Sequence, residues 1–296
     1  MIPKNISKHH LLLHLIVFIW GWSPILGKSI SVQAFQLVWF RILITLVALI
    51  IYFSSQKTNL RVTKKKFLIL FSIGAVIAFH WFCFYNAIKV SNVSVTLVAF
   101  STGALFTSII EPIFYKRKIV WYEMLFGVLI ICAIAMIFSV EIQYYWGFIF
   151  GILAALTSSL FTVWNGLLVR DTTSEVITFY ELSGGLVCLT GYLFFTGEFS
   201  KEFFVISSSD FFFLGILSVV GTAFPFVAST NLLKKLSPFT VTLTVNLETV
   251  YGIIFAIIIW PETEHMSVFF YLGASIILGV ILLNAIVKAK IKKEIA

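Results

Sequence analysis

Charged residues are scarce in this sequence and make up only 11% of its 296 positions. A soluble domain carries about 25% charged residues, so this chain lacks the polar surface that would face water on all sides. Apolar residues make up 60% of the chain instead, and the mean hydropathy is +1.03. This composition excludes an ordinary soluble protein and indicates a chain that lies in lipid.

Cysteine is also rare. Its three copies, Cys83, Cys132 and Cys188, show no Cys-x-x-Cys spacing and fall within apolar stretches, so they predict neither a disulfide framework nor a metal site. The chain has no Walker phosphate loop, no Gly-x-Ser-x-Gly and no His-Glu-x-x-His. The sequence therefore predicts no metal and no cofactor, and it argues against an ATP-driven pump.

Ten apolar stretches of about 20 residues dominate the chain, and this is the length at which an α-helix crosses a hydrocarbon layer about 30 Å thick. They are Leu11–Ser31, Ala34–Phe53, Phe67–Ile88, Val93–Tyr115, Ile119–Val140, Trp146–Val169, Val176–Thr196, Phe211–Leu233, Phe239–Trp260 and Val268–Val287. The connections between them are too short for a soluble domain. We predict an all-α integral membrane protein with ten transmembrane helices.

The positive charges fall on one side of this predicted bundle. If the N-terminus is placed in the cytoplasm and the sides alternate, 17 of the 21 Lys and Arg residues lie inside. Only Lys28, Lys89 and Lys201 lie outside, and Arg41 lies within the membrane. Cytoplasmic loops carry such an excess, so we expect a multi-pass protein of the inner, cytoplasmic membrane with both termini in the cytoplasm. The net charge of +8 then reflects topology and contact with lipid headgroups, not a nucleic-acid partner.

A short internal repeat links the two halves of the chain. Ser91-Asn-Val-Ser-Val-Thr-Leu opens the fourth stretch, and Ser237-Pro-Phe-Thr-Val-Thr-Leu opens the ninth. Each half holds five predicted helices, an odd number, so the second half must be inverted relative to the first. We predict inverted five-helix repeats over residues 1–143 and 144–296. Secondary transporters are commonly built this way, with the substrate site near the midplane.

Several short motifs add to the helix count and the repeat. They are Trp20-Gly21-x-x-Pro24-x-x-Gly27-Lys28, Arg41 in the second stretch, Asn86-Ala87-Ile88-Lys89-Val90-Ser91, and Leu247-Glu248-Thr249 followed by Glu262. Together they resemble the EamA-like, ten-helix branch of the drug/metabolite transporter superfamily. The resemblance implies a carrier of small solutes, often an exporter of amino acids or other metabolites, with helices 5 and 10 toward the edge. Two positions depart from the pattern: Thr249 stands where proline is usual, and Lys116 stands where an acidic counterpart of Glu262 is expected.

Few ionisable residues fall within the predicted spans, where each costs about 2.5–3.5 kcal/mol on insertion scales. At a rise of about 1.5 Å per residue, Arg41, His80 and Glu248 share one central layer, whereas Glu181 lies nearer the cytoplasm. We expect Arg41 and Glu248 to form a charge pair. Either the pair handles substrate or protons, with Glu248 as the coupling group, or it is structural and fixes helix packing.

Polar and aromatic residues complete the predicted cavity. On a regular helix, Asn246 and Glu248 project to nearly opposite sides, so the ninth helix has little surface left for lipid and is expected to be central. Trp20, Trp164 and Asn165 are the further candidates for the cavity wall, although Trp164 also suits an interfacial aromatic belt.

Prolines and small residues shape the predicted helices. Pro24, Pro112 and Pro225 interrupt the first, fourth and eighth helices, and each frees a backbone carbonyl that needs another partner. The pair Gly147-x-x-x-Gly151 indicates close helix contact and leaves a homodimer open.

We interpret the sequence as a secondary transporter that moves a small metabolite, such as an amino acid or related solute, by alternating access. Export is expected, and uptake of a small solute is the main alternative. A membrane enzyme or scaffold without transport is the rival from another class, but Arg41, His80 and Glu248 come with no placed nucleophile. The solute and the driving ion, a proton or another ion, are left open.

Overall fold

The computed structural model describes residues 8–116, 118 and 121–295, and the regular structure in them is helical. The α-helices are α1 (Lys8–Gly21), α2 (Ser23–Ser29), α3 (Ala34–Ser55), α4 (Lys64–Val90), α5 (Val93–Phe100), α6 (Gly103–Phe114), α7 (Trp121–Val140), α8 (Tyr145–Leu168), α9 (Ser174–Phe195), α10 (Ser208–Ser218), α11 (Phe224–Leu232), α12 (Pro238–Val245), α13 (Leu247–Ile259), α14 (Pro261–Glu264) and α15 (Val268–Ile295). Two short 3-10 helices, η1 (Ile142–Tyr144) and η2 (Glu202–Phe204), and a π-helix, η3 (Val219–Ala223), complete the described elements.

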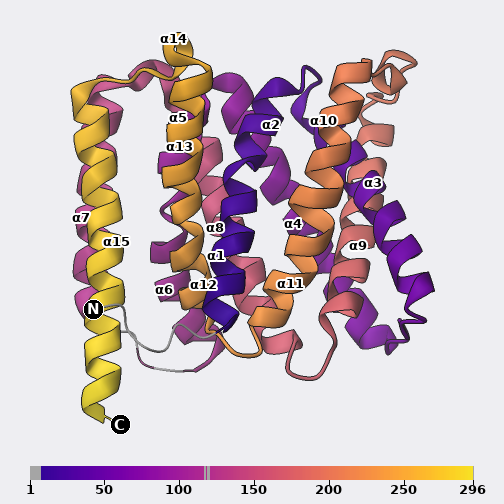
Figure 1. Cartoon of the computed structure of the whole chain (residues 1–296), viewed down its shortest axis with the longest axis horizontal. Coiled ribbons are helices and arrows are strands. Elements are labelled where there is room, and N and C mark those ends of the chain that lie inside the picture. Colours follow the sequence, from indigo (N-terminus) through magenta and orange to yellow (C-terminus); the bar gives the residue numbers. More distant parts are fainter. Residues whose placement is uncertain (1–7, 117, 119–120, 296) are drawn as a thin grey trace.

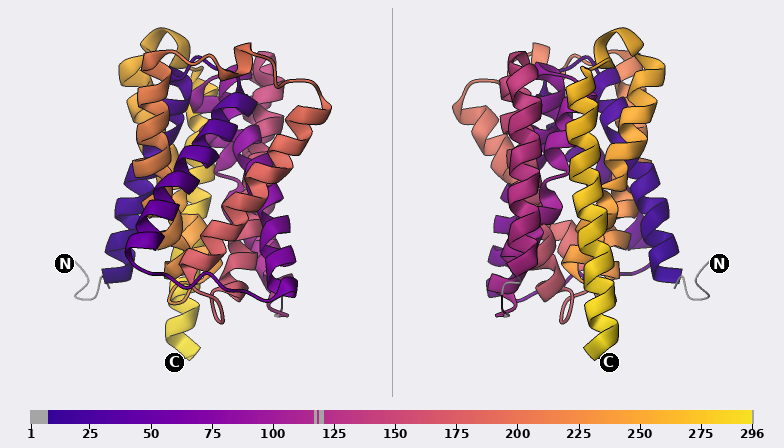
Figure 2. Two further views of the ribbon diagram at one scale, coloured as in Figure 1. Left: turned by 90° about the vertical axis from the view of Figure 1, so that its right-hand side faces the viewer. Right: turned by 90° about the vertical axis from the view of Figure 1, so that its left-hand side faces the viewer.

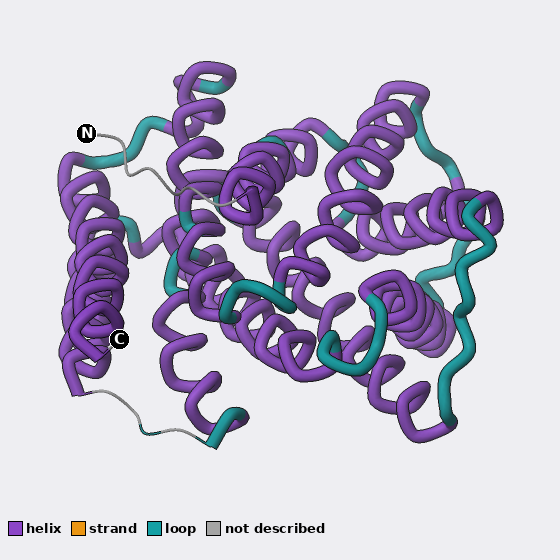
Figure 3. The backbone as a smooth tube through the Cα atoms, turned by 60° about the horizontal axis from the view of Figure 1, so that its bottom comes forward, coloured by secondary structure: helices purple, strands orange, loops and turns teal. Residues whose placement is uncertain are grey.

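The long helices run between two faces of the molecule (Figure 1). We call the face where α1 begins and α15 ends the terminal face, and the opposite face, which carries α14, the distal face (Figures 1 and 2). Loops are short segments between helices (Figure 3). Because α1 begins and α15 ends on the same face, the chain crosses between the two faces an even number of times, as ten helices require.

Eight helical segments of the described chain are long and apolar enough to cross a membrane. Their ends lie within four residues of the predicted ones. The fifth and tenth predicted helices correspond to α7 and α15, in which shorter apolar stretches cover Leu125–Ile137 and Val268–Val280. The predicted start of the fifth helix, Ile119, lies outside the described residues.

Some predicted helices are interrupted. The first breaks between α1 and α2, just before Pro24, as expected. The fourth breaks between α5 and α6, whereas Pro112 remains inside α6. Ser101 and Thr102 explain this break, because their hydroxyls donate 2.7 Å hydrogen bonds to the carbonyls of Val98 and Ala99 and so compete with the regular helix ladder.

Glycines set the closest helix contacts. A Cβ at Gly74 of α4 would lie 1.9 Å from the carbonyl oxygen of Glu181, and a Cβ at Gly147 of α8 would lie 2.2 Å from Ser91 Oγ. Gly151 packs in the same way on Ala99 of α5. The Gly147-x-x-x-Gly151 pair therefore serves contacts within this chain and gives no support to a homodimer.

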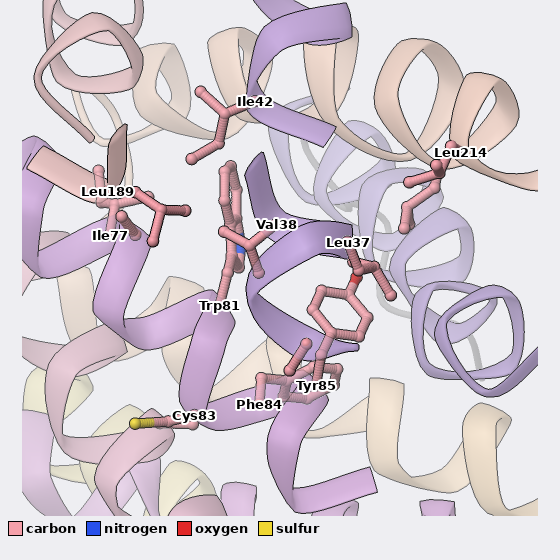
Figure 4. Packing of buried hydrophobic residues seen from close by; sticks show 14 of the residues in the cluster. Leu37, Val38, Ile42, Ile77, Trp81, Cys83, Phe84, Tyr85, Leu189 and Leu214 are labelled. Atoms are coloured by element: carbon pink, nitrogen blue, oxygen red, sulfur yellow. The ribbon is translucent and has the colours of Figure 1, made fainter. Parts of the chain in front are cut away.

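Apolar side chains of α3, α4, α9 and α10 form the largest core cluster. In Figure 4, Trp81 and Tyr85 project from α4 beside Leu37, Val38 and Ile42 of α3. This packing holds α3 firmly against α4 and so fixes the height of Arg41, which lies on the same helix. By contrast, α7 and α15 pack on each other at one edge of the molecule (Figure 1), which confirms the expected place of helices 5 and 10.

The two repeats run in opposite senses. Helix α5 begins at the distal face, next to α14, whereas its counterpart α12 begins at the terminal face, next to the end of α6. Both are eight residues long, and each begins with a side-chain cap: Asn92 accepts from the Val95 N–H, and Ser237 accepts from the Thr240 N–H. The architecture is thus the predicted pair of inverted five-helix repeats.

Candidate functional site

A cavity lies between the two repeats and is lined from both of them. Of the seven site residues predicted from the sequence, it brings together six: Trp20, Arg41, His80, Asn165, Asn246 and Glu248. Its volume is about 90 Å³, and because one buried water needs about 10–15 Å³ on this scale, it has room for about six to nine waters. The cavity therefore suits a small solute.

The remaining wall is aromatic near the middle of the bundle and polar toward the terminal face. Phe84, Phe100, Phe161 and Phe226 lie around the centre. Serine and threonine hydroxyls of α8, α11 and α12 add hydrogen-bonding groups, and Leu233, just after α11, extends the lining toward the terminal face. The cavity combines an apolar wall with a few polar groups, as small-molecule sites generally do.

Arg41 is buried and firmly held. Its Nε donates to Thr222 Oγ1 at 2.9 Å, and its Nη1 donates to the Tyr85 hydroxyl at 2.7 Å. The guanidinium also lies over the Trp81 ring, 4.1 Å from the ring centroid, where a cation is attracted to the aromatic face. These contacts use two of the five N–H groups of the guanidinium, so it keeps donors for a solute.

The π-helix η3 supplies the first of these partners. Thr222 lies in η3, and its hydroxyl donates to the carbonyl of Leu217, five residues earlier, at 2.7 Å. In this wider π-helical turn, Thr222 Oγ1 lies within hydrogen-bond distance of Arg41, which is 181 residues away in the chain. π-Helical turns of this kind occur often at functional sites.

Trp20 is held by the same segment. Pro225 has no N–H and cannot donate to the carbonyl of Gly221, four residues earlier. The indole Nε1 of Trp20 donates to that carbonyl instead, at 3.2 Å. The freed carbonyl expected from Pro225 has thus found its partner in a residue of the cavity wall.

His80 faces the cavity from α4. Its Nδ1 lies 2.8 Å from the carbonyl oxygen of Ala154, and because a carbonyl only accepts, Nδ1 carries the hydrogen. Nε2 is then the nitrogen left for other partners. Phe84, Phe100 and Phe161 surround the ring at centroid distances of 5.4 to 6.3 Å.

The ninth predicted helix is not continuous, which corrects the expectation from a regular helical wheel. It breaks at Asn246, between α12 and α13, although Thr249 replaces the usual proline. Hydrogen bonds to the third preceding residue, from Asn246 N–H to the Leu243 carbonyl and from Thr249 N–H to the Asn246 carbonyl, interrupt the regular helix there. Asn246 and Glu248 both line the cavity. Thr249 instead donates to the carbonyl of Leu97 on α5, at 3.1 Å.

Arg41 and Glu248 do not form the direct charge pair expected from the sequence. Within the described residues, the ion pairs join Lys28 to Glu264 and Lys66 to Asp171, and Glu248 accepts no hydrogen bond. The guanidinium is instead held on its own side of the cavity by hydrogen bonds to Tyr85 and Thr222 and by the ring of Trp81. The two opposite charges border one cavity and remain separate.

Trp164 is not brought to the cavity. The residues of α8 that line it, Ser158, Phe161, Thr162 and Asn165, follow one face of the helix. Trp164 lies about 100° around the helix from Asn165, and its ring packs edge-on against Phe114 with centroids 5.5 Å apart. It is a packing residue between α8 and α6.

At the distal face, two contacts between the repeats and one within the first repeat close the bundle. Lys28 forms a 2.6 Å ion pair with Glu264. Asp210 of α10 accepts two hydrogen bonds from Ser31, each of 2.6 Å. Lys89 donates to the carbonyl of Ile30. Of the two glutamates of α14, Glu264 is buried, whereas Glu262, the glutamate of the resemblance, is exposed.

Two carboxylates cap the broken helices across the repeat boundary. Glu264 accepts hydrogen bonds from the backbone N–H groups of Val93 and Ser94 at the start of α5, at 3.0 and 2.8 Å. Glu111, near the end of α6, accepts a 2.9 Å hydrogen bond from the backbone N–H of Phe239 at the start of α12. A carboxylate at a helix N-terminus satisfies unpaired N–H groups and the positive end of the helix dipole.

Sequence reasoning missed Glu264 and Glu111 as a matched pair, and it missed Thr222 and Tyr85 as partners of Arg41. An acidic residue close to the end of the fourth and of the ninth predicted helix was the available signal for the first pair, although it does not distinguish Glu264 from Glu262. Hydroxyl residues such as Thr222 and Tyr85 give no comparable signal, because many of them occur in this chain.

A model of the EamA-like transporter family matches residues 7–139 and again residues 145–286. The chain belongs to the EamA-like transporter family. Each match covers one five-helix repeat, and the family includes membrane transporters of small solutes. No curated protein matches the chain.

One solved structure, described only as the crystal structure of a protein, has a similar fold. The two superpose with a TM-score of 0.67 and 14% sequence identity, over 94% of this chain and 97% of the other. At this low identity the likeness concerns the fold alone.

Proposed function

We propose that this protein is a secondary transporter that exports a small zwitterionic metabolite, such as an amino acid, by alternating access. The observation that carries this proposal is the separation of Arg41 and Glu248 across one cavity. A guanidinium with unused N–H groups suits a solute carboxylate. A carboxylate without a hydrogen-bond partner among the described residues suits a solute ammonium group.

The aromatic wall supports a solute with an apolar part. Trp81, Phe84, Phe100 and Phe226 line the cavity between the polar groups. Apolar walls with a few placed polar groups provide affinity and orientation together. The size of the cavity favours a metabolite over a drug-sized molecule.

The closed distal face and the cavity lining toward the terminal face support alternating access. We infer that residues 1–143 and 144–296 act as the two halves, and that they exchange roles when the protein opens to the other side. The inverted arrangement supports this exchange, since in inverted-repeat transporters one repeat rocks against the other around a fixed central site.

Glu248 is the proposed coupling group for a proton or another ion. It is an acidic residue in the cavity wall, and intramembrane carboxylates commonly lie on ion pathways. Glu248→Gln should then remove the dependence of transport on a proton gradient, while the variant still inserts and folds.

We infer that the terminal face is cytoplasmic and that the protein lies in the cytoplasmic membrane. The loop that contains Lys57, Arg61 and Lys64–Lys66 supports this orientation through its positive charge. A cysteine placed at Lys65 should resist an impermeant thiol reagent added to intact cells and react after the membrane is opened. Labelling in intact cells would contradict the orientation.

Growth assays test the function itself. Cells that express the protein should tolerate one or more toxic amino acids or analogues better than cells that express Arg41→Ala. Greater sensitivity of the wild-type cells would instead indicate uptake. Equal growth over the whole panel would count against an amino-acid solute.

A further inference from the structure

A second intramembrane carboxylate, Glu181, lies outside the Arg41 and Glu248 layer. It belongs to α9, and its side chain is fully buried. The amide Nδ2 of Asn165 donates a 3.1 Å hydrogen bond to its Oε2. Within the described residues, Glu181 forms no ion pair.

Three oxygen atoms around this contact are buried without a hydrogen-bond partner in the described part of the chain. They are Glu181 Oε1, Asn165 Oδ1 and Thr178 Oγ1. Thr178 precedes Glu181 by three residues and so lies on the same face of α9. Buried polar atoms in folded proteins are nearly always paired, so this cluster needs an explanation.

A proton bound to the Glu181 carboxylate explains the unpaired atoms. A buried carboxylate with a single amide hydrogen bond carries a large desolvation cost, which neutralisation removes. A carboxylic acid at Glu181 donates from Oε1, and Asn165 Oδ1 is an acceptor on the amide that already donates to Oε2. One proton then provides partners for both atoms. Within the described residues, no group of three or more His, Cys, Asp or Glu side chains that could hold a metal ion occurs here.

No titratable side chain of the neighbouring helices contacts Glu181. Helices α3, α4 and α11 pack on α9, and α8 supplies Asn165. The charged or titratable residues of these helices are Arg41, Tyr52, Lys64, Lys65, Lys66, His80, Cys83, Tyr85, Lys89 and Tyr145. None of them has a hydrogen bond or ion pair to Glu181 in the described structure, and α4 meets Glu181 at Gly74. The proton is therefore the available counter-charge.

We propose that Glu181 and Asn165 form a proton-binding site in the wall of the cavity, separate from the solute-binding layer. A hydronium ion in the cavity gives up a proton and becomes water, an O–H bond forms at Glu181 Oε1, and the carboxyl group becomes neutral. Release reverses these steps. Asn165 connects the site to the solute, because it lines the cavity and also holds Glu181. The site itself requires no transport, whereas its coupling to transport rests on the proposed function.

Infrared spectroscopy of the full chain in lipid tests the site. At neutral pH the wild-type protein should show the carbonyl stretch of a protonated carboxyl group. Glu248→Gln serves as the background for the comparison, because Glu248 is a second buried carboxyl group of the cavity that can carry a proton. In this background Glu181→Gln should remove the band, whereas Glu262→Gln, at an exposed position, should leave it intact. The band should shift in D₂O, since Asn165 joins the site to cavity water. A missing wild-type band, a band that persists when Glu181→Gln is added to this background, or a band that does not shift in D₂O would overturn the proposal.

A second variant keeps the test decisive if Glu181→Gln does not fold. Asn165→Ala leaves the carboxyl group in place but removes both of its hydrogen-bonding partners, so the band should remain and move in frequency. An unchanged band in Asn165→Ala would overturn the pairing. The spectrum is recorded without any solute, so a protein that fails to transport amino acids can still show the site.

Discussion

Glu264 accepts two hydrogen bonds from Ser94, one from its backbone N–H and one from its hydroxyl, and both are 2.8 Å long. The two residues belong to different repeats, so this contact joins the repeats at the distal face. Lys28 adds a 2.6 Å ion pair to the same carboxylate. The contact thereby links closure of the distal face to the N-terminus of a helix that reaches the cavity.

Glu264→Gln should loosen the distal face. The substitution removes the charge that Lys28 and the α5 N-terminus share, and hydrogen bonds to charged groups are worth about 1.5–3 kcal/mol each. The measurement uses a protein whose native cysteines are replaced and which carries Ser158→Cys in the cavity. With Glu264→Gln, this cysteine should react with an impermeant maleimide from the distal side at least roughly ten-fold faster than with Glu264 intact. Glu262→Gln is the matched control and should have no effect. An equal rate in both variants would show that Glu264 does not hold the face closed.

Glu111→Gln should shift the equilibrium in the opposite direction. Glu111 caps α12 at the terminal face as Glu264 caps α5 at the distal face. Loss of its charge weakens contacts that favour closure of the terminal face, so the protein spends more time open to that side. Distal labelling of Ser158→Cys should fall below the wild-type rate. A rise would contradict the assignment of the two carboxylates to opposite faces.

Trp20→Phe should reduce thermal stability by about 1–2 kcal/mol, the typical cost of leaving a buried acceptor unpaired. The variant keeps an aromatic ring but loses the indole N–H that serves the Gly221 carbonyl. Pro225→Ala restores a backbone N–H near that carbonyl. In a protein that carries Pro225→Ala, Trp20→Phe should therefore lower the free energy of unfolding by less. Trp22→Phe is the control, since the described structure gives its indole no hydrogen bond. Equal costs in both backgrounds, measured by thermal unfolding in detergent, would refute this role of Trp20.

Arg41→Ala and Glu248→Ala should act almost independently on stability. Breaking a direct buried ion pair strands a charge and costs about 3–5 kcal/mol, which removal of the partner then restores. Since Arg41 is held by Tyr85 and Thr222 and not by Glu248, the double variant should equal the sum of the single variants within about 0.5 kcal/mol. Unfolding curves of the four proteins provide the test, and rescue of Arg41→Ala by Glu248→Ala would mean that the pair is structural.

The fold was largely predictable, because it follows from where apolar runs begin and end. Hydropathy located eight of the spans to within four residues at each end. The side on which each connection lies stays a prediction from loop charge. Depth along the helices also placed Arg41, His80 and Glu248 near one another. These features depend on local composition and on the fixed rise of a helix, which the sequence specifies directly.

Details that depend on local distortion were not predictable in the same way. A helical wheel assumes a constant rotation of 100° per residue, and the break at Asn246 interrupts that regular rotation just before Glu248. The π-helix η3 likewise turns Thr222 toward Arg41. Whether Glu262 or Glu264 is buried depends on the turn of α14, which no residue pattern in the sequence indicated.

Solute counterflow in proteoliposomes tests the central claim most directly. Liposomes that contain the purified protein and one unlabelled amino acid are given the same amino acid in labelled form, across a panel of zwitterionic, cationic and anionic compounds. We predict exchange of at least one zwitterion with an apolar side chain, and a loss of roughly ten-fold or more in both Arg41→Lys and Glu248→Gln, since each charge-assisted contact is worth more than about 1.4 kcal/mol. Exchange that is absent for every zwitterion, or unchanged in both variants, would contradict the account.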